Sequence, residues 1–355
     1  MDVSLPDLVA LSLVPPWRWR EAVEALRSGV SPRDVLTRLS AERKQRERLR
    51  VVTLLARANA ALARGVTSGL TPIAWTDPIY PSALGAIADP PFVLWTRGIA
   101  DVLHRPAVAI VGSRAGSPYA LAVAERLASD LAARGVVIVS GLARGVDSAA
   151  HRGAIAAGGS TVAVLGSGAD VIYPSEHASL AREVQATGVV ASELVPGTPP
   201  RAHFFPLRNR IISGLSRAVV VIEAGEKSGS LITARAALEQ GRDVLAVPGN
   251  VLSGRNRGAH ALLRDGAKIV ESADDILEEL KLPARPWAGT GRVEPSGKQA
   301  VVEPVLGCFV PGDVMDFDTL AARSGLSPER LLPRLLELEL SGQVTRVGGG
   351  RFVRS

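Results

Sequence analysis

Six short runs rich in valine and isoleucine follow one another between residues 107 and 249, and helical hydrophobic spacing separates most of them. In order, the runs read AVAIVG, VVIVSG, TVAVLG, VVASEL, AVVVIEA and DVLAVPG. Nearly continuous apolar runs are typical of strands buried on both faces, as in a parallel sheet that helices cover on both sides. The sequence therefore predicts a doubly wound α/β domain with a mainly parallel sheet.

The residues before this domain predict a small all-helical domain. Apolar residues have helical spacing in Trp19–Ser28 and Pro32–Leu39, and we expect a long arginine-rich helix over Ala41–Arg64. The ERKQRERLR run within that helix mixes both signs of charge, which favours a solvated helix face over a DNA contact. Residues Thr71–Arg97 read as strands and loops that lead into the α/β domain.

The C-terminal residues predict a linker followed by a winged helix. The linker is rich in Pro, Gly, Ser and Thr and has no periodicity. Thr319–Arg323 and Ser327–Leu340 then read as two helices joined by a glycine turn, with a kink expected at Pro333, and QVTRV and RFVR read as a hairpin. We therefore divide the chain into a helical domain (1–66), an α/β domain (67–283), a linker (284–300) and a winged-helix domain (301–355).

The second helix of the winged helix carries charges of both signs. Arg330 and Arg334 share one face, but Glu337 and Glu339 follow and would repel a duplex beside them. Binding of double-stranded DNA and a contact with protein both stay open for this domain.

Composition narrows the function classes. Lys and Arg number 41 against 35 Asp and Glu, a net charge of +6 that permits a nucleic-acid partner without requiring one. The single Cys308 excludes an intrachain disulfide, and the five histidines lack the spacing of a zinc site, so we expect no metal and no cofactor. Because no signal peptide is recognisable and the apolar runs end before about 18 residues, we expect a cytoplasmic protein without membrane contact.

The stretch HFFPLRNR, residues 203–210, gathers aromatics and arginines in a chain that has few aromatics. No acidic residue lies between Leu194 and Ile222, whereas that interval holds Arg201, Arg208, Arg210 and Arg217. A phenyl ring stacks on any base, and guanidinium groups bind phosphates through paired hydrogen bonds, so the stretch suggests single-stranded nucleic acid. The open alternative is that the two phenylalanines are core residues beside a turn at Pro206, with solvated arginines.

Three glycine-rich loops should converge on one crevice, because each follows a strand and the carboxyl ends of parallel strands meet at one edge. Each loop offers backbone amides near the start of a helix, where phosphate groups bind, and two of the loops add an arginine. The residues expected to meet the ligand are Gly112, Ser113 and Arg114 in the first loop, Ser140, Gly141 and Arg144 in the second, and Lys227, Gly229 and Ser230 in the third.

Common enzyme motifs are missing. The first run is followed by Gly112 and Gly116 rather than by GxGxxG, and the chain has no GxxxxGK[ST]. Asp147, Ser148 and His151 invite a hydrolase interpretation, but nothing supplies a nucleophile elbow or an oxyanion hole. A hydrogen bond on the helix surface is therefore the favoured explanation, and we expect no catalytic residues.

Several long motifs occur together and in order, among them AIVGSR, SGLARGVDSAAHRGAIAAGGSTVAVLGSG, YPSEH, SELVPG, FPLRNRIISGL, EAGEKSGSLITARAALEQGRDVLAVPG and GAHALLRDGAKIV. Across residues 72–280 the chain closely resembles the DNA-processing protein A family, also called DprA or Smf. The resemblance implies a non-enzymatic protein with an extended Rossmann-like domain that binds single-stranded DNA, forms a homodimer and loads the recombinase RecA during natural transformation (competence). The sequence leaves open whether this protein serves transformation, repair or both.

Family motifs can be carried over position by position. The GSR motif places Arg114 at the DNA pocket, and the FPxRNR motif places Phe205, Arg208, Asn209 and Arg210 there. The SGL and SGSL loops correspond to 140–142 and 228–231. Arg201 stands beside Ala202, where some relatives carry a lysine, and is the candidate for that charge. By the same resemblance, the apolar segment around Ala261, Leu262, Leu263 and Ile269 is the candidate dimer interface.

The alternative function is a nucleotide-binding enzyme, such as a nucleoside-monophosphate phosphoribohydrolase on a similar sheet. Those enzymes resemble one another in a PGGxGTxxE motif whose glutamate is catalytic. Alignment of Gly229 and Ser230 with its Gly-Thr pair puts Thr233 at the glutamate position, and a hydroxyl group cannot replace a carboxylate.

Overall fold

The computed structural model describes residues 4–41, 51–281, 305–309, 314–340, 342–347 and 350–354. The ERKQRERLR run and the predicted linker lie outside the described residues. At the centre is a nine-stranded sheet with the order β1-β2-β6-β5-β4-β3-β7-β8-β9. Its strands are β1 (Thr71–Ala74), β2 (Val93–Gly98), β3 (Ala107–Val111), β4 (Val137–Ser140), β5 (Thr161–Val164), β6 (Val189–Ser192), β7 (Ala218–Val221), β8 (Asp243–Ala246) and β9 (Lys268–Ile269).

The six valine- and isoleucine-rich runs form β3 to β8, and all the pairings among these six strands are parallel. The predicted parallel sheet is thereby confirmed. The segment before it supplies β1 and β2, which are antiparallel to each other, and β2 is antiparallel to β6. The stretch that we expected to lead into the domain thus extends the sheet at one edge, and β9 forms the opposite edge.

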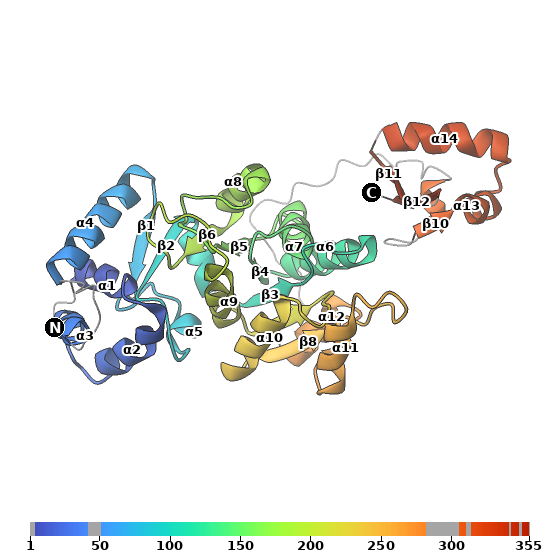
Figure 1. The fold of residues 1–355 in the computed structure, drawn as a ribbon. Coiled ribbons are helices and arrows are strands. Elements are labelled where there is room, and N and C mark those ends of the chain that lie inside the picture. Colours follow the sequence, from blue (N-terminus) through green and yellow to red (C-terminus); the bar gives the residue numbers. More distant parts are fainter. Residues whose placement is uncertain are drawn as a thin grey trace.

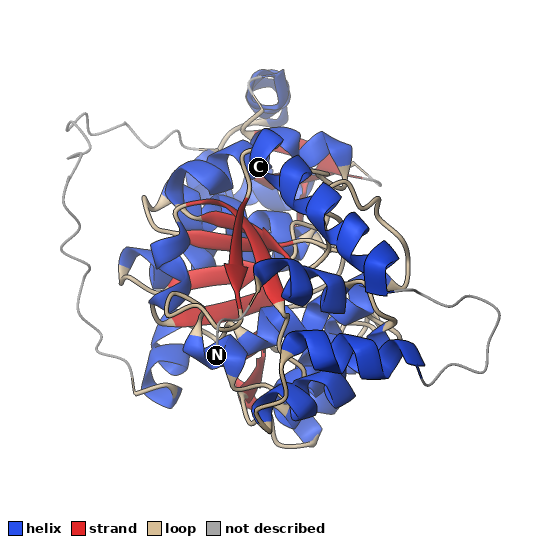
Figure 2. Ribbon diagram, turned by 90° about the vertical axis from the view of Figure 1, so that its left-hand side faces the viewer, coloured by secondary structure: helices blue, strands red, loops and turns tan. Residues whose placement is uncertain are grey.

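Helices cover both faces of the sheet (Figures 1 and 2). On β3, Val108 and Ile110 belong to one apolar cluster and Ala109 and Val111 to another, because successive side chains of a strand point to opposite faces. The first cluster includes α6 (Pro118–Ala133), α7 (Val146–Ala156) and α12 (Ala273–Glu279). The second includes α5 (Ser82–Gly85), α9 (Phe204–Gly214), α10 (Ser230–Glu239) and α11 (Arg257–Arg264). The remaining elements of this part are α8 (Ala178–Thr187), η2 (Ala100–His104) and η3 (Ser175–His177).

The helices that follow β3 and β7 lie on opposite faces of the sheet. The connection from β3 to β4 runs through α6 on one face, whereas the connection from β7 to β8 runs through α10 on the other. Because β3 and β7 are neighbours, the loops that follow them diverge and leave a crevice at their carboxyl ends. This is the place where the sequence predicts the ligand site.

The N-terminal helices are α1 (Leu5–Ser12), η1 (Pro16–Arg18), α2 (Trp19–Arg27), α3 (Pro32–Ala41) and α4 (Val51–Thr67). Their apolar residues share one continuous cluster with β2, β5, β6 and α8. Helix α4 approaches β2 closely, since a Cβ atom on Gly65 would lie 2.6 Å from the Trp95 ring. Of the helix expected over 41–64, the structure describes Ala41, at the end of α3, and the part of α4 from Val51 onward.

The C-terminal residues form the predicted winged helix. Its elements are η4 (Leu306–Cys308), β10 (Val314–Asp316), α13 (Phe317–Ser324), α14 (Pro328–Leu340), β11 (Val344–Val347) and β12 (Arg351–Arg354). Gly325 ends α13 with φ of 67°, a left-handed conformation that glycine adopts without strain. Helix α14 continues across Pro333, and β12 pairs with both other strands of this sheet.

A buried ion pair ties α9 to the rest of the domain. Both terminal nitrogens of Arg210 donate to Glu193, at 2.7 and 2.8 Å, and its Nε donates to Asp89 at 3.0 Å. Its guanidinium group also lies 5.3 Å from the centre of the Trp19 ring on α2. Burial disfavours the charged form, but the carboxylates of Glu193 and Asp89 outweigh it and raise the pKa of Arg210. Arg210 therefore stays charged and holds α9 against the carboxyl end of β6.

We expect Arg210→Ala to lower the free energy of unfolding by about 3 to 5 kcal/mol, because it would leave the Glu193 carboxylate buried without its partner. Urea unfolding measures the effect. Arg201→Ala, at an exposed position, is the matched control and should change the value by no more than about 0.5 kcal/mol. The paired change Arg210→Met with Glu193→Leu should restore most of the loss. A stability of Arg210→Ala equal to that of the unaltered protein would contradict this role.

Candidate nucleic-acid interface

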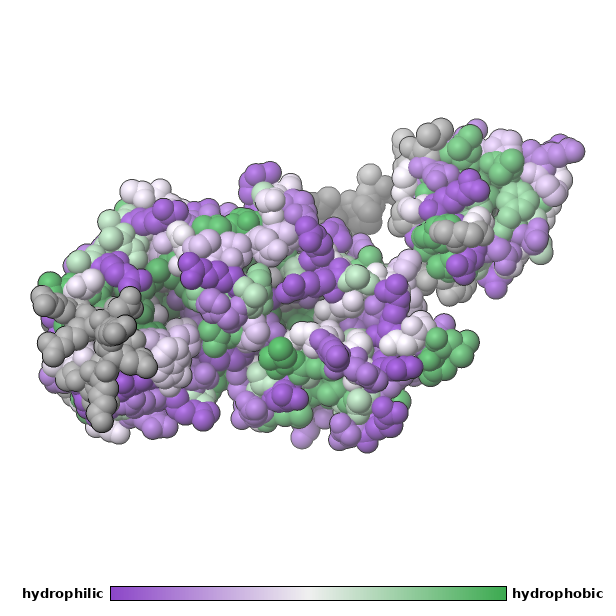
Figure 3. All heavy atoms as spheres, viewed as in Figure 1, coloured by the Kyte–Doolittle hydropathy of each residue, from purple (hydrophilic) through white to green (hydrophobic). Residues whose placement is uncertain are grey.

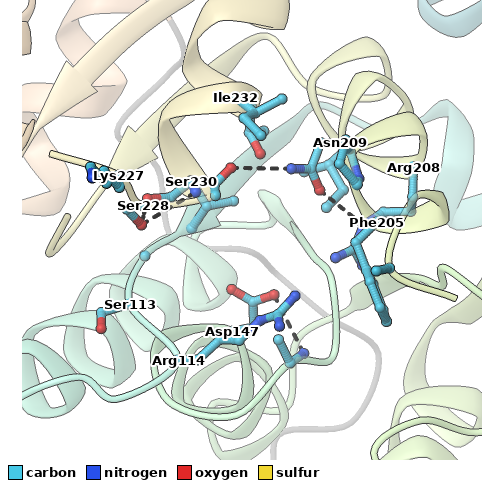
Figure 4. A pocket seen from close by; sticks show the side chains of 18 of the residues that line it. Ser113, Arg114, Asp147, Phe205, Arg208, Asn209, Lys227, Ser228, Ser230 and Ile232 are labelled. Atoms are coloured by element: carbon cyan, nitrogen blue, oxygen red, sulfur yellow. Dashed lines mark hydrogen bonds between the residues drawn. The ribbon is translucent and has the colours of Figure 1, made fainter. Parts of the chain in front are cut away.

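A cleft of about 930 Å³ opens at the carboxyl ends of β3 and β7 (Figure 4). Four segments supply most of its lining: the loop from β3 to α6, the loop from β4 to α7, residues 200–209 at the start of α9, and the loop from β7 to α10. Residues from 111 to 233 thus meet at one place.

Glycine permits direct contact between two of these loops. Gly145 has φ of 76°, and a Cβ atom there would lie 2.3 Å from the carbonyl oxygen of Ser113 and 2.7 Å from that of Arg114. The Val146 amide donates to the same Ser113 oxygen at 3.2 Å. The β4–α7 loop therefore supports the backbone that presents Arg114.

Arg114 and Phe205 meet in the cleft. The guanidinium carbon of Arg114 lies over the Phe205 ring, 5.1 Å from its centre, in a cation–π contact. Pro206 follows in the first turn of α9, where a missing amide hydrogen does no harm, so this residue belongs to a helix rather than to the turn considered above. The neighbouring Phe204 contacts the ring of His203, with 4.2 Å between ring centres.

Arg208 lies at the bottom of the cleft. Its Nη1 donates to the carbonyl oxygens of Gly141, at 2.8 Å, and of Val164. A Cβ atom on Gly141 would lie 2.2 Å from Nη1, so glycine leaves room for this guanidinium group. Burial lowers the pKa of Arg208 to about 10, which still leaves it charged at neutral pH. The next residue, Asn209, donates to the carbonyl oxygen of Gly229 at 3.2 Å and so links α9 to the β7–α10 loop.

Asp147 and His151 are both buried and bind the backbone of the β4–α7 loop. Asp147 accepts from the amides of Gly141, at 3.1 Å, and Ala143, at 3.4 Å, and burial raises its pKa. The Leu142 amide donates to Nε2 of His151 at 3.3 Å, and burial lowers the pKa of His151 to about 3. The surface hydrogen bond expected from the sequence is therefore wrong, because both side chains turn inward and order the loop.

The start of α6 is already occupied by a carboxylate. Oε1 of Glu223 accepts from the Ser117 amide at 3.2 Å, and Oε2 accepts from the Ser117 hydroxyl group at 2.6 Å. Asp147 is an acidic residue in the first turn of α7, although the amides that it accepts from, those of Gly141 and Ala143, precede that helix. These two helix starts are therefore neutralised by the protein itself, and the positive charge of the cleft comes from Arg114, Arg201, Arg208 and Lys227.

Ten of the fourteen predicted site residues line the cleft: Gly112, Ser113, Arg114, Arg201, Phe205, Arg208, Asn209, Lys227, Gly229 and Ser230. Ser140 does not, because its buried hydroxyl group donates to the carbonyl oxygen of Ile110 at 2.6 Å. Gly141 lies beneath Arg208, and Arg144 is exposed outside the cleft in an ion pair with Glu176. Arg210 points into the buried ion pair described above. Ser140, Gly141, Arg144 and Arg210 therefore lie outside the lining of the cleft.

Tyr173 also lines the cleft, and sequence reasoning missed it. It is one of few aromatic residues in this part of the chain, and it lies in the YPSEH motif after the third of the six runs. Tyr173 lies in a loop that has no regular spacing of apolar residues. Its position relative to Phe205 depends on how that loop packs, which only the folded structure shows.

The face of the molecule in Figure 3 is covered mainly by hydrophilic residues, with smaller hydrophobic areas between them. Within the described ranges, no helix combines the length and the apolar character needed to cross a lipid bilayer.

Two families match the sequence. Residues 71–281 match DNA recombination-mediator protein A, and residues 299–350 match the DprA winged helix domain. Protein Smf of Escherichia coli is 42% identical over 280 residues, which cover 78% of this chain and 75% of the relative. DNA processing protein DprA of Streptococcus pneumoniae is 46% identical over 205 residues, covering 58% of this chain and 72% of the relative.

Solved structures agree with these matches. The X-ray structure of Streptococcus pneumoniae DprA aligns with a TM-score of 0.68 and 36% identity, and covers 79% of this chain and 99% of that one. DprA of Helicobacter pylori, whose structure was described for its binding of single-stranded DNA, aligns with a TM-score of 0.54 and 30% identity, over 60% of this chain and 95% of that one. Because sequence and fold agree along the sheet domain, this chain belongs to the DNA recombination-mediator protein A family, whose members carry the names DprA and Smf.

Proposed function

We propose that this protein is a recombination mediator that binds single-stranded DNA in the cleft, protects it and loads RecA onto it. It acts in the cytoplasm, in natural transformation. The observation that carries the proposal is the cleft itself, where Arg114, Arg208 and Lys227 surround a wall that contains Phe205. The Helicobacter pylori relative, described as binding single-stranded DNA, supports it.

The chemistry of the cleft favours single strands over duplexes. Guanidinium and ammonium groups attract phosphates, and an aromatic wall requires bases that are free to leave a stack. Buried Arg208 supplies a fixed charge at the bottom, whereas Arg114 and Lys227 are exposed and can follow the backbone of the strand. Double-stranded DNA remains a candidate partner for the winged helix, whose Arg330 is exposed.

We propose that the protein works as a homodimer through the edge of the sheet at β9. Ile269 on β9 is 56% exposed, and an edge strand offers unpaired backbone groups to a second chain. On the adjacent α11, Leu262 and Leu263 are partly buried against the apolar cluster of this face and leave part of their surface open.

We propose further that the protein is not an enzyme. Among the described residues that line the cleft, Asp147 is the one acid, and it is committed to the amides of its own loop. Thr233 lies in the cleft where a phosphoribohydrolase would need its glutamate. Incubation with nucleoside monophosphates should therefore release no free base, and release above background would favour the alternative of a nucleotide-cleaving enzyme.

We expect Arg114→Ala to weaken binding of a labelled single-stranded oligonucleotide by about tenfold or more. It should also reduce the slope of log K against log salt by about 0.7, because one phosphate contact is lost. Fluorescence anisotropy at several salt concentrations measures both values. Arg144→Ala is the matched control: Arg144 is an exposed arginine of the neighbouring loop that lies outside the cleft, so its removal should change neither value. If Arg114→Ala left both values unchanged, or if Arg144→Ala changed them as much, the strand would not be confined to the cleft.

Affinity for single-stranded DNA should rise as the pH is lowered from about 8 towards about 4.5, in part because Asp147 loses its charge. Burial raises the pKa of Asp147, so protonation begins above the usual aspartate range near 4 and removes a negative charge that faces phosphate. Asp147→Asn should bind several-fold more tightly at neutral pH and depend less on pH. The difference between the pH profiles of the two proteins is the measurement. Parallel profiles would show that Asp147 does not face the strand.

Loading of RecA onto single-stranded DNA is a separate prediction. On single-stranded DNA already covered by a single-strand-binding protein, RecA should assemble faster when this protein is added, and Arg114→Ala should remove most of that acceleration. ATP hydrolysis by the RecA filament reports its assembly. Tight DNA binding without acceleration would restrict the role to protection.

A further inference from the structure

Tyr173 presents an exposed aromatic ring to the cleft. It lines the cleft, 45% of its surface is exposed, and its ring centre lies 5.7 Å from that of Phe205 at an interplanar angle of 40°. The ring is thus available to a planar ligand and is supported from one side by Phe205.

Residues near Tyr173 on both sides form hydrogen bonds within the fold. The Val171 amide donates to the carbonyl oxygen of Gly168 at 2.8 Å, and the Ser167 hydroxyl group donates to the Val171 carbonyl oxygen at 2.6 Å. On the other side, Nδ1 of His177 forms a hydrogen bond of 2.8 Å with the carbonyl oxygen of Leu142. A ring on such a support loses little conformational freedom when a base stacks on it.

Phe205, by contrast, is engaged by the protein. A Cβ atom on Gly166 would lie 2.8 Å from Cδ1 of Phe205 and 3.1 Å from Cε1, so the ring rests against the Gly166 backbone. The guanidinium group of Arg114 lies over the same ring. Phe205 is therefore suited to position Arg114 and to support Tyr173, and it offers a base less free surface than Tyr173 does.

We propose that Tyr173 is the residue on which a nucleobase of the bound single strand stacks, while Phe205 holds Arg114 in place for the adjacent phosphate. The inference rests on the proposed function and assigns a role to a residue that the motif analysis left without one. The stacking requires an aromatic face and no hydroxyl group, so it tolerates any base.

The test compares Tyr173→Leu, Tyr173→Phe and the unaltered protein on an oligothymidine of moderate length. Tyr173→Leu should weaken binding by about 5- to 150-fold and leave the salt slope unchanged, because a stacking contact is lost and no phosphate contact is. Tyr173→Phe should bind like the unaltered protein. Tyr119→Leu is the matched control, since Tyr119 is a 38% exposed tyrosine of α6 outside the cleft lining.

A second readout reports stacking directly. Oligothymidine with 2-aminopurine at single positions should lose fluorescence on binding to the unaltered protein and to Tyr173→Phe. At saturating concentrations of Tyr173→Leu this loss should be reduced at the position that meets the ring. A smaller loss at saturation cannot come from weaker binding or partial unfolding, so this readout separates stacking from a structural effect.

The outcomes separate this inference from the function on which it rests. If the unaltered protein fails to bind single strands, the proposed function itself is wrong. If it binds, and Tyr173→Leu matches it in affinity and in quenching, DNA binding stands and the stacking role is excluded. A reduced salt slope in Tyr173→Leu would also overturn the inference, because it would mean that the ring serves to position a cation.

Discussion

The crevice between β3 and β7 is the feature on which the rest of the site depends. These neighbouring parallel strands lead into helices on opposite faces, so their loops cannot pack against each other. Helix α9 then lies across the opening and contributes Phe205, Arg208 and Asn209 from a distant part of the chain. Gly141 lets the guanidinium group of Arg208 approach the backbone closely, and Gly145 does the same for the backbone of Ser113 and Arg114. A Cβ atom at either position would lie too close to these groups.

The two arginines of the RNR motif have opposite roles because of helix geometry. Residues two apart on an α-helix point about 200° away from each other. Arg208 therefore faces the bottom of the cleft, while Arg210 turns towards Glu193, Asp89 and the Trp19 ring. One motif thus serves both the site and the attachment of α9 to the fold, and a substitution in it must be checked for stability before its effect on binding is interpreted.

Anions commonly bind at the starts of helices, but the positive charge of this cleft has another source. Glu223 and Asp147 occupy the starts of α6 and α7, so the attraction for a polyanion comes from side chains. Arg114 and Lys227 are exposed and adjustable, whereas Arg208 is buried and fixed by carbonyl oxygens. Such a combination is suited to a flexible strand, whose phosphates vary in position.

The sequence by itself determined the parallel sheet, the flanking helices and the winged helix, because hydrophobic periodicity and glycine turns act locally along the chain. It also located the loops of the cleft, since strand ends define the edge of a parallel sheet. It could not decide which side chains enter the cleft: Arg144, Arg210 and Ser140 lie outside it, and Tyr173 lies within it. Those positions depend on helix rotation, on buried partners such as Glu193, and on contacts such as that between Phe205 and Gly166, which exist only once distant segments have packed together.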